Sequence, residues 1–222
     1  MKKIFFLIST IFLFSCQTLP LINSPASLSG QKSFTCPSPF LKQKYRLVHS
    51  IETRMAGNTQ SAIIGVTLAD PFTRSVSCAI ITAEGMTLFE AESGPRGIKV
   101  RRALPPFDSA DFAKNMIDDI KLIFLAPEGK LQAKGRLADG STACRYQENN
   151  GEWIDVTENK SEGTQIKRYT SSGALKRQIS FMSTAGNIYQ RIELRAKETF
   201  DYSLLMTLIE AQPVKTKTFK RK

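Results

Sequence analysis

Residues 107–124 read FDSADFAKNMIDDIKLIF, and this stretch predicts a helix in the middle of the chain. Asp108 is placed to cap its N-terminus, and Phe107 is placed to pack against Phe112 as a hydrophobic staple. The helix carries one apolar stripe with a spacing of four residues, made of Phe112, Met116, Ile120 and Phe124. Beyond it, Pro127 allows a second short helical turn, which Gly129 weakens.

On both sides of this helix the apolar residues recur with a period of two, which predicts β-strands. Before the helix, strands are expected at 45–54, 61–68, 75–82, 86–92 and 98–103. After it, they are expected at 136–137 (a weak signal), 142–147, 152–156, 165–170, 175–183, 188–196 and 202–210. The connections are short and rich in turn residues, as in Asp139-Gly140, which favours antiparallel neighbours.

The predicted sheet is too large for the helix to cover. About ten strands of ordinary length present a face of roughly 1,000 Å², whereas the helix shades only about 240 Å². The sheet therefore has to curl around the helix or split into two stacked sheets. A capped apolar helix midway through the strands favours the curl. The expected fold class is mainly β (α+β): a strongly curved antiparallel sheet, or incomplete β-barrel, of about ten strands with a central plug helix.

A curl of more than eight strands leaves interior room for a ligand, whereas a two-sheet sandwich fills its own core. If such a cavity exists, apolar residues of the helix stripe and of two strands are the expected lining. These are Phe112, Met116, Ile120, Phe124, Ile64, Val66 and Ile80.

The first sixteen residues are typical of an export signal. Met1-Lys2-Lys3 is basic, 4–14 is apolar and too short to span a bilayer, and Leu13-Phe14-Ser15-Cys16 resembles the bacterial lipobox. We therefore expect a lipoprotein signal peptide at 1–15 and a diacylglycerol and an N-acyl chain on Cys16, with no other cofactor and no metal. The alternative is a plain signal peptide. Gln17 favours a location on the outer membrane, facing the periplasm.

After the anchor, residues 16–44 are rich in Pro and Ser and are predicted to be a tether. The folded domain is expected at 45–213, followed by a basic tail at 214–222. The formal charge of +11 falls to +9 once Lys2 and Lys3 are removed. Because an exported chain does not meet nucleic acid, anionic lipid or lipopolysaccharide phosphates are the expected partners of the tail, unless it is simply solvated.

The remaining cysteines and the one histidine give weak support for catalysis. Cys36, Cys78 and Cys144 permit at most one disulfide, and their spacing does not reveal the pairing. A pair between His49 and one of these thiols is conceivable, but strand histidines are usually structural. Asp118-Asp119 point about 100° apart on a helix and make a poor carboxylate dyad. We expect no catalytic residues and no enzyme.

The order of lipobox, tether, strands, central helix and further strands resembles the LolA/LolB family. The most similar part is 75–125, which ends in the run MIDDIKLIFLAP. The resemblance implies an incomplete antiparallel barrel whose concave apolar face, covered by helices, accepts acyl chains. LolB is an outer-membrane lipoprotein that receives lipoproteins from soluble LolA. It presents a functional leucine on a turn that here reads Ala83-Glu84-Gly85-Met86, so the resemblance points to a relative of LolB rather than to LolB itself.

Two functions follow as expectations. The first is a lipid or lipoprotein acceptor or chaperone of the cell envelope, with acyl chains or a carrier protein as partners and the membrane bound through Cys16. The second is a non-catalytic structural or adaptor lipoprotein, with a filled core, that recruits an envelope complex.

Overall fold

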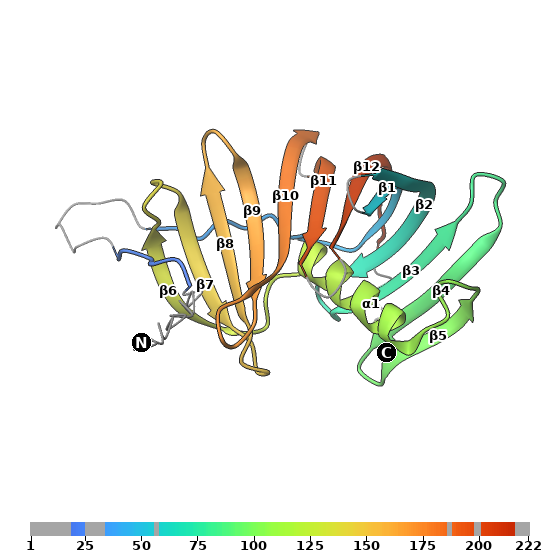
Figure 1. Ribbon diagram of the computed structural model, residues 1–222, viewed down its shortest axis with the longest axis horizontal. Coiled ribbons are helices and arrows are strands. Elements are labelled where there is room, and N and C mark those ends of the chain that lie inside the picture. The colour runs from blue at the N-terminus through green and yellow to red at the C-terminus, as the bar shows by residue number, and fades with distance from the viewer. Residues whose placement is uncertain (1–18, 25–33, 56–57, 186–187, 198–200, 216–222) are drawn as a thin grey trace, which may run out of the picture.

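The computed structural model describes residues 19–24, 34–55, 58–185, 188–197 and 201–215, which form one large antiparallel sheet with a helix packed on it (Figure 1). The strands of the first half are β1 (Tyr45–Met55), β2 (Asn58–Asp70), β3 (Ser75–Ile81), β4 (Thr87–Gly94) and β5 (Gly97–Ala103). The helix α1 (Ala110–Phe124) follows. The second half consists of β6 (Lys130–Arg136), β7 (Thr142–Gln147), β8 (Trp153–Asn159), β9 (Gly163–Tyr169), β10 (Leu175–Ala185), β11 (Ile188–Ala196) and β12 (Tyr202–Pro213).

The sheet joins two meanders through its first and last strands. Its order is β5-β4-β3-β2-β1-β12-β11-β10-β9-β8-β7-β6, and every neighbouring pair is antiparallel. The expected fold class is confirmed: the protein is mainly β, with a strongly curved, open sheet and a central helix. Because β5 and β6 are the two edge strands, α1 belongs to the connection between opposite edges of the sheet.

Twelve strands form where about ten were expected, and β6 is the clearest difference. The sequence signal at 136–137 was weak, and a helical turn was considered after Pro127. The chain instead runs as a strand over Lys130–Arg136 and pairs with β7. Its side chains are nearly all exposed, so the strand lacks the alternating apolar pattern that reveals a half-buried one.

The sheet has two faces, which we call inner and outer. The inner face packs against α1 and contains residues in direct register such as Phe89, Ile80 and His49 in the first half, and Val156 and Ile166 in the second. The apolar ones belong to one continuous core, and His49 is buried beside it. The helix covers only part of this face, since its backbone comes closest to β3, β4 and β5.

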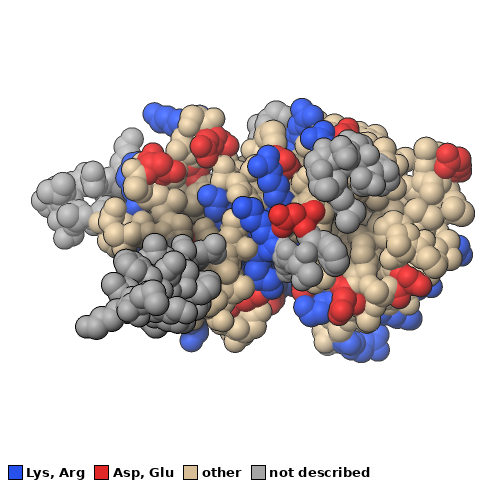
Figure 2. Space-filling view, viewed as in Figure 1, with Lys and Arg blue, Asp and Glu red and all other residues tan. Residues whose placement is uncertain are grey.

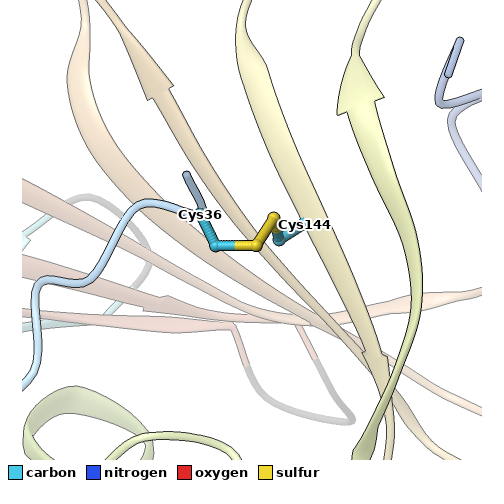
Figure 3. Close-up of a disulfide and its surroundings, with 2 residues drawn as sticks. All are labelled: Cys36 and Cys144. Atoms are coloured by element: carbon cyan, nitrogen blue, oxygen red, sulfur yellow. A yellow bond between two sulfur atoms is a disulfide. The ribbon is translucent and has the colours of Figure 1, made fainter. Parts of the chain in front are cut away.

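Residues 34–44, expected to be part of a tether, belong to the folded domain instead. Cys36 forms a disulfide with Cys144 on the inner face of β7 (Figure 3). Phe40 is buried in the core, and the backbone N–H of Leu41 donates to the carbonyl oxygen of Phe124 at the end of α1, at 3.0 Å. The segment therefore covers part of the inner face that α1 leaves open. The predicted signal peptide, Cys16 and the tail beyond Lys215 lie outside the described residues.

The start of α1 differs in one residue from the expectation. Ser109, rather than Asp108, is the N-cap, because its backbone is extended and its hydroxyl oxygen accepts a hydrogen bond from the N–H of Phe112 at 3.1 Å. Within the described ranges, no helix has both the length and the apolar character needed to cross a bilayer.

Candidate functional site

The candidate site is the contact between α1 and the inner face. At the first turn, the ring of Phe112 lies 5.1 Å from that of Phe107 and 5.2 Å from that of Phe89 on β4, centroid to centroid. At the last turn, the ring of Phe124 lies 5.9 Å from that of His49 on β1. The predicted staple between Phe107 and Phe112 is thus present, and the apolar stripe of the helix faces the sheet as expected.

The predicted lining residues divide between the two faces. Ile80 is buried on the inner face, as are Ile120 and Phe124 of the helix, whereas Phe112 and Met116 are half-buried. Ile64 and Val66 were expected in the same lining, but they are on the outer face.

The reason for this correction is the register of β2 with its two neighbours. The inner position between these two residues is Gly65, which pairs with both Ile80 and His49. A Cβ at Gly65 would lie 2.5 Å from Cδ1 of Ile51, so a larger residue there would require the Ile51 side chain to shift. The alternating Ile64 and Val66 therefore mark the outer face, although they are the more apolar set.

The apolar inner face continues past α1 to the edge strand β5. Val100 pairs with the buried Ala91 and Ile98 pairs with Ser93, so both point to the inner side. Yet Val100 is 44% exposed and Ile98 is 41% exposed. The helix α1 contacts β5, and its residues Phe112 and Met116 are only half-buried. We call Ile98, Val100, Phe112 and Met116 the open edge.

At the other end of α1 the site becomes polar. Asp119 is buried and accepts hydrogen bonds from Nε of Arg177 on β10 at 2.9 Å and from the hydroxyl of Tyr202 on β12 at 3.1 Å. Burial raises the pKa of Asp119, an effect that Arg177 and Tyr202 oppose. Its neighbour Asp118 turns away and pairs with Lys114 at 3.0 Å, so the two carboxylates do not act together.

A cavity of about 250 Å³ lies beside this buried pair. Its walls are largely charged and include Lys121 of α1, Glu152 of the β7–β8 turn and Arg168 of β9. Nε of Arg168 is buried without a hydrogen-bond partner, 3.7 Å from a carboxylate oxygen of Glu152. The volume is below the roughly 300–1,000 Å³ of typical ligand pockets, and the walls do not suit an acyl chain. Sequence reasoning missed this polar cluster because its members come from four separate elements.

The residues considered for catalysis are buried or held in the disulfide. Cys144 is consumed by the disulfide, and burial raises the pKa of the Cys78 thiol to about 12, so it stays protonated. His49 is buried, its Nδ1 has no hydrogen-bond partner, and burial lowers its pKa to about 4. Among the described residues, no group of three or more His, Cys, Asp or Glu side chains is placed to hold a metal ion.

Comparison with solved structures bears on the fold. A LolA superfamily protein from Nitrosomonas europaea superposes with a TM-score of 0.55 and 10% sequence identity, over 80% of this chain and 89% of that one. An outer membrane lipoprotein-sorting protein domain from Vibrio parahaemolyticus gives a TM-score of 0.42 and 10% identity, over 77% of this chain and 85% of that one. No protein-family model and no curated protein matches the chain. The chain therefore has a LolA/LolB-like fold.

Proposed function

We propose that this protein is a lipoprotein of the bacterial cell envelope that accepts an acyl chain at the open edge and acts as a lipid or lipoprotein acceptor or chaperone. The observation that carries this proposal is the exposure of Ile98 and Val100 on the inner side of β5, a strand that α1 contacts with Phe112 and Met116 only half-buried. Such a surface is costly in water, and a hydrocarbon chain laid along it removes that cost.

The positions of the apolar and charged residues define how the acyl chain is oriented in the site. The chain enters between the first half of α1 and β4–β5, where the helix stripe is only half-buried. It stops before the buried pair of Asp119 and Arg177, because an apolar tail offers those charges no hydrogen bonds. The polar end of the guest remains at the β5 edge. A longer chain requires the N-terminal half of α1 to move away from the sheet.

Two features support an envelope location. A disulfide such as Cys36–Cys144 persists in an oxidising compartment, which for a bacterium is outside the cytoplasm. The lipobox ending at Cys16 supplies an acyl anchor, and several acyl chains make such an anchor stable. Substituting Cys16→Ala abolishes palmitate labelling and accumulates the unprocessed precursor. Normal labelling of this variant contradicts the anchor.

The acyl-binding test uses matched variants on the two edge strands. Val100→Asp places a charge on the open edge of β5, and Leu131→Asp places one at a similarly exposed position (46%) on the far edge strand β6. Cells expressing the full chain receive a fatty acid that carries a photoreactive diazirine and an alkyne. After illumination and digestion, the light-dependent adducts are mapped by mass spectrometry, separately from the acylated peptide of Cys16.

We expect adducts in peptides covering β5 and the first half of α1. One buried charge in an apolar site costs several kcal/mol, so Val100→Asp reduces these adducts by about tenfold or more, whereas Leu131→Asp keeps them. Adducts confined to the Cys16 peptide, or reduced equally by both variants, contradict the proposal.

The second candidate is an adaptor lipoprotein with no guest. Residues 34–44 fill part of the inner face that α1 leaves open, which favours a solid core. Capture of one stable protein partner by crosslinking in cells, together with an absence of light-dependent adducts at β5, supports this alternative.

A further inference from the structure

We propose that the outer face across β7–β11 lies flat on an anionic bilayer, with its basic residues on the lipid headgroups and Leu21 entering the headgroup layer. This orientation rests on the proposed anchor at Cys16. It concerns a surface that is separate from the open edge.

The chain next to the anchor is fixed to this face rather than free. Nη2 of Arg145 on β7 donates to the carbonyl oxygen of Pro20 at 2.9 Å, and Arg145 is itself held by both carboxylate oxygens of Asp155 at 2.7 Å. Asn23 pairs through its backbone with Arg136 on β6, with both N–H···O distances at 2.9 Å. Cys16 is three residues before Leu19, so at full extension it lies within about 11 Å of Leu19. The anchored membrane surface is therefore held close to β7.

The same face carries basic residues in register with this attachment point. One straight row of paired positions runs from Arg145 through Asp155, Lys167 and Gln178 to Arg195. Neighbouring strands are about 4.8 Å apart, so this row carries positive charge roughly 19 Å across the sheet from Arg145.

Two further cations extend this row along β11. Arg191 is on the same side of the strand as Arg195, and Lys197 is the first residue after the strand ends. We call Lys167, Arg191, Arg195 and Lys197 the basic stripe. Figure 2 shows Lys and Arg side chains gathered over β10 and β11. The acidic residues of these rows are already paired, Asp155 with Arg145 and Glu193 with Arg195 at 2.9 Å, so the stripe keeps a positive charge.

Exposed apolar side chains accompany the charge. Leu21 is 76% exposed, while its neighbour Ile22 packs against β6 at Gly135. Met182, which pairs with Arg191 on the outer face, is 37% exposed. Basic residues interspersed with exposed apolar ones are typical of a surface that binds an anionic membrane, each cation contributing about 1 kcal/mol.

The test measures how fast lysines react while the full-length acylated chain is on vesicles. The chain is reconstituted on phosphatidylcholine vesicles, with or without phosphatidylglycerol, and treated with a membrane-impermeant acylating reagent. Lys167 and Lys197 report the basic stripe, and Lys114 on α1 is the internal control. We expect Lys167 and Lys197 to react about threefold or more slowly on the anionic vesicles, with Lys114 unchanged. A salt concentration of about 1 M, where the Debye length is about 3 Å, removes the difference.

Charge-reversal variants make the test specific. Arg191→Glu with Arg195→Glu abolishes the slowing, whereas Arg101→Glu with Arg102→Glu on β5 keeps it. Equal rates on both vesicle types overturn the proposal. Slow rates that persist in detergent without lipid also overturn it, because a second copy of the chain then covers the face. If the proposed acyl anchor at Cys16 is absent, the chain separates from the neutral vesicles on flotation, while Lys167 and Lys197 still react slowly on the anionic vesicles. If fatty-acid adducts at β5 are absent, the proposed orientation on the membrane is unaffected.

Discussion

Asp119 on α1 and Arg177 on β10 form a buried ion pair that ties the helix to the second half of the sheet, with 2.9 Å between Oδ1 and Nε. The backbone of the helix comes closest to β3, β4 and β5 of the first half. The pair therefore fixes the C-terminal half of α1 across the junction of the two meanders.

We predict that Asp119→Ala strongly destabilises the protein. It leaves the guanidinium of Arg177 buried without this carboxylate, which typically costs about 3–5 kcal/mol in the free energy of unfolding. Asp118→Ala is the matched control on the next residue, and its exposed pair with Lys114 is worth only about 0.3–0.5 kcal/mol. Urea unfolding of both variants measures the contrast. Equal and small losses would show that the buried pair does not hold the helix.

Two single substitutions, Ser109→Ala and Asp108→Ala, show which residue caps the N-terminus of α1. Ser109→Ala removes the hydroxyl that accepts from the N–H of Phe112 and costs about 1 kcal/mol. Asp108→Ala, one residue earlier, changes stability by less than half of that. Thermal or urea unfolding decides between them, and a larger loss for Asp108→Ala would restore the cap predicted from the sequence.

Removing the disulfide tests whether residues 34–44 belong to the fold. The bond closes a loop between positions 108 residues apart, so the double substitution Cys36→Ala and Cys144→Ala lowers the free energy of unfolding by about 4–5 kcal/mol in the chain-entropy estimate. In the unsubstituted protein, none of Cys36, Cys78 and Cys144 reacts with a thiol reagent before unfolding, and Cys78 reacts afterwards. A loss below about 1 kcal/mol in the free energy of unfolding would show that residues 34–44 act as a tether and not as part of the fold.

The stability of the protein depends on pH through His49. Burial lowers its folded-state pKa from 6.5 to about 4, so the unfolded chain binds a proton that the folded chain does not. The contribution of neutral His49 to the free energy of unfolding is therefore fully present above pH 6.5 and is lost as the pH falls toward 4. At about 1.4 kcal/mol for each pKa unit, the loss is about 3 kcal/mol.

The variant His49→Leu isolates this effect from the carboxylates that titrate in the same range. Because Nδ1 of His49 has no hydrogen-bond partner, leucine is tolerated at pH 7.5. The difference in unfolding free energy between variant and original chain grows in favour of the variant as the pH falls to 4. A difference that stays constant with pH would show that His49 is protonated in the folded state.

Periodicity made most of the fold predictable, and the exceptions have physical causes. The helix stripe and most strands alternate clearly because one side of each is buried. The strand β6 does not, since it is exposed at an edge. Residues 34–44 have the composition of a linker, and only burial of Phe40 and the bond at Cys36 make them part of the core.

The candidate site was predictable on the helix and less so on the sheet. The stripe from Phe112 to Phe124 faces the core because its spacing fixes one side of a helix. On β2, the apolar set that includes Ile64 lies on the outer face, and the inner position beside it is Gly65, which has no apolar side chain to reveal the inner face. The pairing of Asp119 with Arg177 joins residues 58 positions apart, which no local pattern indicates.

The most direct measurement is native mass spectrometry of the mature chain purified from its membrane. The proposed function predicts a population that carries a non-covalent lipid, lost on collisional activation while the covalent anchor stays, and depleted by Val100→Asp but not by Leu131→Asp. A single species with the anchor alone, identical in all three proteins, would contradict the claim that an acyl chain binds at the edge of β5.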